Sequence, residues 1–148
     1  MKIELNRRIR RDVDTVRAAV TDAETLAEWQ PTLKSLRVVS GRRGDAGSVS
    51  ELVYDENGRE VRLEETVTDT RDPELLELTY RGGQAVSRLR HWFASPAPGE
   101  TVWTVDCDVR FHGLWRRLLA PFLKGSVRRR IEGDMARLQQ LLEQGASP

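Results

Sequence analysis

Cysteine and histidine are scarce in this chain, and their scarcity limits the disulfides and metal sites that it can form. Cys107 is the single cysteine among 148 residues, which excludes an internal disulfide. Only two histidines accompany it, so few side chains are present from which a metal site of the zinc type could be assembled. We therefore expect a protein that carries neither a metal nor a cofactor.

Long apolar runs and a surplus of one charge are also missing. No stretch approaches the ~18 consecutive apolar residues of a transmembrane helix, and residues 1–8 lack the apolar region of a signal peptide. The 24 Lys and Arg residues nearly balance the 23 Asp and Glu residues, so no overall field attracts nucleic acid. These features predict a cytoplasmic protein that does not bind nucleic acid and is not integral to a membrane.

Two short helices are predicted after an opening strand at residues 3–10. Asp12 is a typical helix N-cap, and valines at helical spacing follow it. Asp22 can cap a second helix over residues 24–29, which Pro31 ends because proline lacks a backbone N–H. Beyond Pro31 the hydrophobic period changes to two, as in strands. Six further strands are expected, at residues 34–40, 48–55, 60–68, 75–81, 85–94 and 101–111.

A long amphipathic helix is predicted to close the chain, directly after Gly113. We expect it to break near Pro121 into pieces at 114–120 and 122–143, since Pro121 starts or kinks the second piece by removing a backbone donor. Its apolar stripe consists of Val127, Ile131, Met135, Leu138 and Leu142. Antiparallel strands followed by such a helix are typical of a helix-grip fold, in which a ligand cavity usually lies between helix and sheet.

The Asn57-Gly58 pair predicts the register of one hairpin. A two-residue Asn-Gly connection favours a type I′ turn, and the turn then sets which residues face each other. The resulting pairs are Glu56 with Arg59, Tyr54 with Val61, Leu52 with Leu63, and Ser50 with Glu65. The apolar face of this hairpin should point toward the closing helix, and it carries Glu65 inward.

The same alternation predicts a mostly apolar inner face for the rest of the sheet. For the strand at 85–94 we expect Leu89, His91 and Phe93 to point inward, and the alternative inner face is Arg88, Arg90 and Trp92. The polar groups on the inner face are then Ser50, Tyr54, Glu65, Tyr80, Ser87 and His91.

Several motifs resemble those of a known superfamily. They are Trp29-Gln30-Pro31 after the helical pair, Gly47-Ser48 before a strand, the run Gly-Leu-Trp-Arg-Arg-Leu-Leu-Ala-Pro-Phe-Leu at 113–123, and the ending Met-Ala-Arg-Leu-Gln-Gln-Leu-Leu-Glu at 135–143. With them the chain resembles the START/Bet v 1-like (SRPBCC) superfamily, and within it the bacterial polyketide cyclase/dehydrase and lipid-transport-like proteins.

The resemblance implies an α+β helix-grip fold. About seven antiparallel strands wrap around the C-terminal helix, two short helices follow the first strand, and an apolar pocket lies between sheet and helix. We expect one such domain over residues 1–144 and a frayed tail at 145–148. No catalytic signature accompanies the resemblance, because the matching motifs belong to the scaffold and the superfamily includes binders, carriers and enzymes.

Three functions are compatible with this sequence. The first is the binding of a small hydrophobic or aromatic ligand, lipid- or polyketide-like, by a monomer or homodimer. The second is a cofactor-independent cyclase or dehydratase, with Glu65 and His91 as the candidate acid–base residues. The third is a stress-related or surface-interaction module with a filled core. The expected ligand-binding residues are Trp29, Leu52, Tyr54, Leu63, Glu65, Leu78, Tyr80, Leu89, His91, Phe93, Trp103, Val105 and Met135.

Other conspicuous residues have structural explanations. Cys107 lies mid-strand among apolar neighbours, where a thiol behaves as a small hydrophobe. The basic residues of the closing helix, from Arg116 to Arg130, could dock an anionic head group or a membrane surface. A solvated helix face, neutralised by Glu132 and Asp134, is the interpretation that the sequence favours.

Overall fold

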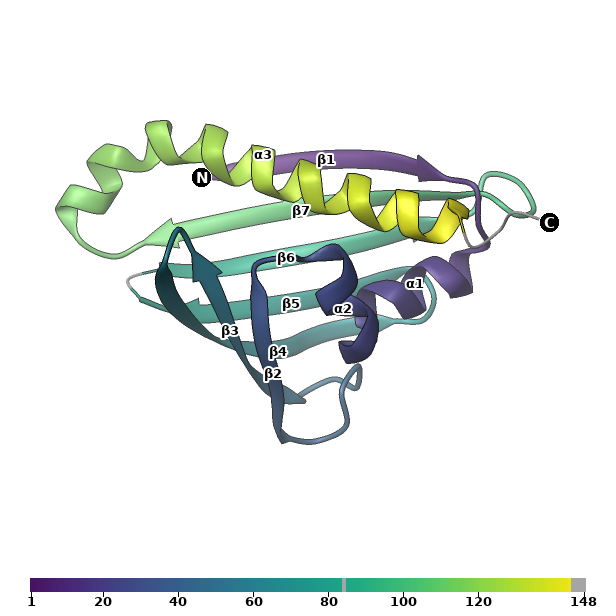
Figure 1. Ribbon diagram of the computed structural model, residues 1–148, viewed down its shortest axis with the longest axis horizontal. Helices are drawn as coiled ribbons and strands as arrows, with labels where there is room; N and C mark the ends of the chain where they lie inside the picture. Colours follow the sequence, from purple (N-terminus) through teal and green to yellow (C-terminus); the bar gives the residue numbers. More distant parts are fainter. Residues whose placement is uncertain (84, 145–148) are drawn as a thin grey trace.

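In the computed structural model, which describes residues 1–83 and 85–144, seven strands form one antiparallel sheet. Their order across the sheet is β1-β7-β6-β5-β4-β3-β2, so hairpins connect β2 through β7 and β1 pairs with the last strand (Figure 1). The strands are β1 (Lys2–Ile9), β2 (Leu33–Ser40), β3 (Val49–Glu56), β4 (Arg59–Arg71), β5 (Leu75–Gly82), β6 (Ala85–Ala94) and β7 (Thr101–Phe111). The predicted tail at 145–148 lies outside the described residues.

The two short helices begin at the predicted caps. Asp12 accepts a hydrogen bond of 3.1 Å from the Thr15 backbone N–H at the start of α1 (Val13–Thr21). Asp22 does the same for Glu24 at 3.1 Å in α2 (Ala23–Trp29). Each carboxylate satisfies a backbone donor that the first helical turn leaves without a partner. Helix α2 packs against the closing helix and β2, and α1 packs against β6.

The closing helix α3 (Leu114–Gln144) is continuous, so the predicted division into two pieces is wrong. Figure 1 shows its first turns, in light green, bending away from the axis of the remainder. A bend fits the predicted kink, since Pro121 has no N–H for the helical hydrogen bond to the preceding turn. In the part of the chain that the structure describes, no helix combines the length and hydrophobicity needed to span a bilayer.

The β3–β4 hairpin has the predicted register. Asn57 and Gly58 both adopt positive φ angles, 55° and 84°, as a type I′ turn requires. The pairs Glu56–Arg59, Tyr54–Val61, Leu52–Leu63 and Ser50–Glu65 all occur. The turn therefore determines which side chains of this hairpin share a face, and the apolar face with Leu52 and Tyr54 is the one that points to the core.

Strand β6 presents the predicted inner face, and the alternative face is excluded. His91 and Phe93 are buried, whereas Arg90 lies on the outer face and donates a 2.8 Å hydrogen bond to Glu77. Trp92 also points outward, where the Arg71 guanidinium lies 5.7 Å from its ring centroid. The core thus lies on one side of the sheet, beneath α1, α2 and α3.

Candidate functional site

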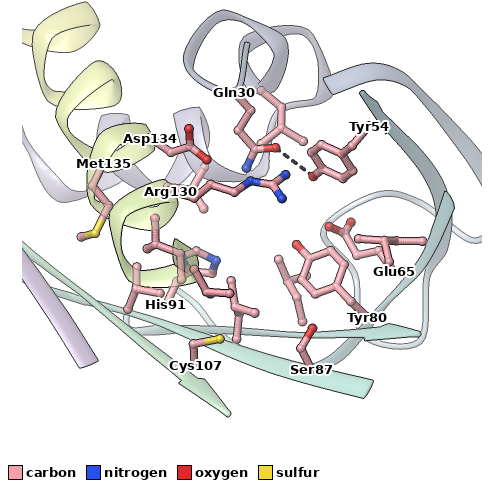
Figure 2. Close-up of a pocket in the computed structure, with 18 of the residues that line it drawn as sticks. Gln30, Tyr54, Glu65, Tyr80, Ser87, His91, Cys107, Arg130, Asp134 and Met135 are labelled. Carbon is pink, nitrogen blue, oxygen red and sulfur yellow. Dashed lines mark hydrogen bonds between the residues drawn. The ribbon is translucent and has the colours of Figure 1, made fainter. Parts of the chain in front are cut away.

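A cavity of about 260 Å³ lies between the inner face of the sheet and α3. Aliphatic and aromatic side chains form most of its wall, and polar side chains point into it from both α3 and the sheet (Figure 2). Eleven of the residues predicted to bind ligand line it: Trp29, Tyr54, Leu63, Glu65, Leu78, Tyr80, Leu89, His91, Trp103, Val105 and Met135.

Two predicted ligand-binding residues, Leu52 and Phe93, do not line the cavity. Both point to the inner side of the sheet, as expected, but each is covered by protein. Leu52 is completely buried in the core. Phe93 lies at the end of β6 that α1 covers, with the Arg17 guanidinium 5.8 Å from its ring centroid. Strand alternation predicts which side a residue faces, and it does not predict what packs on top of it.

Four polar side chains cross the inner face at one level. Ser50, Glu65, Tyr80 and Ser87 pair in sequence across β3, β4, β5 and β6, and we call them the polar row. The next level toward His91 contains Val67, Leu78, Leu89 and Cys107, which are all apolar or weakly polar. Beyond the polar row on the other side, Leu63 and Phe111 also line the cavity, so a polar band crosses an otherwise apolar surface.

Glu65 in the polar row is ion-paired with Arg43 from the loop between β2 and β3. Glu65 is only 2% exposed, and Arg43 Nη1 donates to its Oε1. The same guanidinium donates to the Thr21 carbonyl at 2.8 Å and to Ser50 Oγ at 3.4 Å. These contacts tie the loop, α1 and the polar row together, and they compensate the buried charge of Glu65.

The second carboxylate oxygen of Glu65 is unsatisfied. Oε2 is buried and has no hydrogen-bond partner among the described residues. Tyr80 lies opposite Glu65 in the register. Burial, next the charges of Glu65 and Tyr54, and then a hydrogen-bonding interaction with Glu65 raise the pKa of its phenol well above 10. A buried acceptor without a donor costs ~1–3 kcal/mol, so Oε2 can accept from a ligand that carries a donor, in competition with the neighbouring Tyr80 hydroxyl.

His91 is held as a neutral imidazole. Its Nδ1 accepts a 3.1 Å hydrogen bond from the Trp103 indole, which can only donate, so the ring proton must lie on Nε2. Burial, and next the positive charge of Arg17, lower the pKa of His91 to about 4. At neutral pH the imidazole therefore offers a hydrogen-bond donor to the cavity and has no free basic nitrogen.

Glu65 and His91 do not form an acid–base pair. They belong to β4 and β6, with β5 between them, and His91 lies four residues along β6 from the residue at the level of Glu65. This places their backbones ~10 Å apart across the sheet and ~13 Å apart along it. Figure 2 accordingly shows the two side chains on different sides of the cavity. Each is engaged with another partner, Arg43 for Glu65 and Trp103 for His91.

A second cluster of polar side chains lies where the cavity meets solvent. Tyr54 donates a 2.9 Å hydrogen bond to Gln30 Oε1, and the Arg130 guanidinium lies 4.9 Å from the tyrosine ring centroid. Asp134, one helical turn beyond Arg130, also lines the cavity, and burial raises its pKa to about 6. The predicted solvated helix face is thus wrong for Asp134, which is mostly buried in the cavity wall. Arg130 is exposed, as predicted, and also lines the cavity.

Five polar cavity residues were not among the predicted ligand-binding set: Gln30, Arg43, Ser87, Arg130 and Asp134. Ser87 was predicted only to point inward. A signal for two of them exists in the sequence. Arg130 and Asp134 directly precede Ile131 and Met135 in the apolar stripe, so they fall at the edge of the helix face that points inward. Arg43 comes from an irregular loop, for which no periodicity applies.

Cys107 lines the cavity as a protonated thiol. Burial, followed by the charges of Asp108 and Asp106, raises its pKa to about 11. The thiolate that a nucleophile or a metal ligand requires is therefore not formed at neutral pH. Within residues 1–83 and 85–144, no group of three or more His, Cys, Asp or Glu side chains is arranged to hold a metal ion.

Comparison with known proteins identifies the family of this fold and cavity. The family described as polyketide cyclase / dehydrase and lipid transport matches residues 1–143. The chain belongs to this family. No curated protein sequence matches it.

Solved structures share the fold over nearly the whole chain. A START superfamily protein from Mycobacterium smegmatis has a TM-score of 0.80 at 17% identity, covering 97% of this chain and 97% of its own. A conserved protein from Geobacillus kaustophilus has a TM-score of 0.80 at 14% identity, covering 97% and 96%. The Zhui aromatase/cyclase from a Streptomyces species has a TM-score of 0.80 at 14% identity, covering 99% and 96%. At such identities the likeness shows the helix-grip fold of the START/Bet v 1-like superfamily.

Proposed function

We propose that this protein binds a small, largely apolar ligand in the cavity between the sheet and α3. The observation that carries the proposal is the cavity itself, about 260 Å³ in volume and walled mainly by inward apolar side chains. Its volume lies just below the ~300–1,000 Å³ of typical small-molecule sites, which favours a compact ligand. Membership of a family whose description includes lipid transport supports the same function.

The polar groups of the cavity suggest how such a ligand is oriented. Apolar burial supplies affinity at ~25 cal/mol per Å², and it does not discriminate between orientations. Glu65 Oε2 can accept a hydrogen bond from a ligand hydroxyl or amine, and His91 Nε2–H can donate one to a ligand oxygen. A ligand with a donor and an acceptor on opposite sides of an apolar body fits this arrangement.

Uptake of the fluorescent probe ANS tests the proposal. We expect saturable binding by the wild type, and loss of binding in Leu63→Trp, because Leu63 lines the cavity and the larger ring fills it. Val39→Trp is the matched control, since Val39 is 52% exposed on the edge strand β2. Circular dichroism checks that both variants fold. A wild type that takes up no probe, or equal binding by Leu63→Trp, would show that the cavity is not the binding site.

An enzyme of the cyclase or dehydratase type is the second candidate, favoured by the other half of the family description. For this function Asp134 is a better acid–base group than Glu65 or His91, because a carboxyl that titrates near neutrality suits proton transfer. Turnover of a polyketide-type substrate by the wild type and not by Asp134→Asn, with unchanged ANS affinity, would favour catalysis. The third hypothesis, a module with a filled core, is disfavoured by the cavity.

A further inference from the structure

The first turns of α3 expose large apolar side chains. Leu114, Leu118 and Phe122 are 73%, 61% and 80% exposed. They follow one another at four-residue spacing, which places them along one face of the helix. Among the large hydrophobic side chains whose burial the structure describes, five are exposed, and these three lie within nine positions. Exposed apolar residues gathered in this way mark an interaction surface.

The same segment is strongly basic. Residues 114–131 contain six Lys and Arg residues and no Asp or Glu, although the whole chain has a net charge of only +1. Lys124, Arg128 and Arg129 are exposed, and Arg129 lies seven residues beyond Phe122, close to the apolar face. Arg130 is not available to this surface, because it pairs with Glu56 and covers Tyr54.

We propose that the beginning of α3 docks onto a lipid bilayer with a negative surface charge. An apolar helix face flanked by basic residues is the pattern of helices that lie in the membrane interface, with the apolar side chains among the acyl chains and the cations at the head groups. Figure 1 shows these turns projecting past the end of the sheet, so the bilayer can reach them without displacing the fold.

Charge and exposed apolar surface together favour an anionic bilayer over two other partners, a second copy of the chain and a nucleic acid. A second copy of the chain would bring the same cationic segment against itself, which is repulsive. A nucleic acid would pair with the basic residues, but it would leave Leu114, Leu118 and Phe122 exposed to water. An anionic bilayer satisfies both features. Val127 and Ile131, which follow on α3, line the cavity, so docking here would place the cavity close to the lipid.

Co-sedimentation of the full-length protein with vesicles tests this proposal. The vesicles are phosphatidylcholine alone, or phosphatidylcholine mixed with phosphatidylglycerol. We expect binding to the mixed vesicles only, weakening as salt is added. The triple variant Lys124→Gln/Arg128→Gln/Arg129→Gln should bind about 100-fold more weakly, because each basic residue near the surface strengthens binding about fivefold.

The apolar contribution is tested separately. The double variant Leu118→Ser/Phe122→Ser removes apolar surface without changing the charge, and it should bind at least ~10-fold more weakly. Val39→Ser is the matched control and should bind like the wild type, since Val39 is exposed but lies on β2. Equal binding to neutral vesicles, no binding to anionic ones, or an equal loss in Val39→Ser would overturn the proposal. So would a wild-type dimer that the double variant dissociates in the absence of vesicle binding.

Discussion

Trp103 and His91 hold one another in place from neighbouring strands. The indole N–H donates to Nδ1 at 3.1 Å, and the two rings lie nearly parallel, with centroids 5.9 Å apart. Trp103 also meets Trp29 of α2 edge to face, at 5.8 Å between centroids. The contact between Trp29 and Trp103 links the sheet to the short helices, and burial in this core keeps the His91 ring neutral. Acid should therefore act on stability through His91.

We expect His91 to make the protein less stable as the pH falls from about 6.5 to about 4. Its folded-state pKa is lowered to about 4 from 6.5, so in this range the unfolded chain binds a proton that the folded chain does not. The effect should reach on the order of 3 kcal/mol. His91→Gln retains an acceptor for Trp103 and removes the titration. Urea unfolding at a series of pH values should show a smaller loss in the variant; identical pH profiles would contradict the prediction.

Asp134 should have the opposite effect. Burial raises its folded-state pKa to about 6 from 3.8, against the smaller opposing influence of Arg130 and Arg137, so the folded protein loses stability as the pH rises through this range. Asp134→Asn should therefore stabilise the protein at pH 7, by about 2 kcal/mol after allowance for partial exposure. Thermal unfolding at pH 7 and pH 4 measures the difference, which should be much smaller at pH 4, close to the ordinary pKa of 3.8. Arg137 Nη1 donates a 2.9 Å hydrogen bond to Asp134 Oδ1, and a variant destabilised at pH 7 would show that this contact outweighs burial.

The sequence predicts most where a local rule determines the geometry. The Asn57-Gly58 turn determined the β3–β4 register, and alternation then placed Glu65, Tyr80 and His91 inward. The side chains that pair with Glu65 and His91, and so determine their chemistry, come from other parts of the chain. Arg43 reaches Glu65 from a loop, and Trp103 restrains His91 from the next strand. No periodicity encodes such contacts, so an acid–base pair was a reasonable hypothesis from the sequence and is not one in the structure.

Helix α3 illustrates a second limit. Its apolar stripe was correctly predicted, because burial follows the helical period. The bend near Pro121 leaves the backbone helical, and so the predicted break did not occur. The exposure of Leu118 and Phe122 was not foreseen either, because apolar residues in a helix are normally taken as core.

Two glycines should respond to alanine in opposite directions. A Cβ at Gly82 would collide with the Arg62 carbonyl oxygen on the adjacent strand, so Gly82→Ala should destabilise by about 1–3 kcal/mol. At Gly133, inside α3, the nearest atom to a Cβ is Arg137 Nη1 at 3.5 Å, an ordinary contact. Gly133→Ala should stabilise by about 0.5–1 kcal/mol, because glycine disfavours the helix. The urea midpoints of the two variants measure both changes in stability. Unchanged stability in Gly82→Ala would show that β4 can move away from the added Cβ without loss of stability.

The Arg43–Glu65 pair should stabilise the protein only as a pair. Arg43→Met leaves a buried carboxylate without its cation, and we expect a loss of about 3–5 kcal/mol. Glu65→Leu removes the charge but leaves the Arg43 guanidinium beside an apolar group, so it should also destabilise. The double variant Arg43→Met/Glu65→Leu should recover most of the loss, since no unpaired charge remains.

A double-mutant cycle from urea unfolding measures the coupling of this pair, and additive losses would show that the two side chains do not stabilise one another. The same variants examine the ligand contact. Glu65→Gln replaces one acceptor oxygen by an amide N–H₂, which is a donor, so an endogenous ligand that donates to Glu65 Oε2 should be lost from the purified variant. Mass spectrometry of the compounds that co-purify with each protein detects this. A compound retained equally by Glu65→Gln does not depend on that oxygen, and its orientation must then come from His91 or from the groups around Asp134.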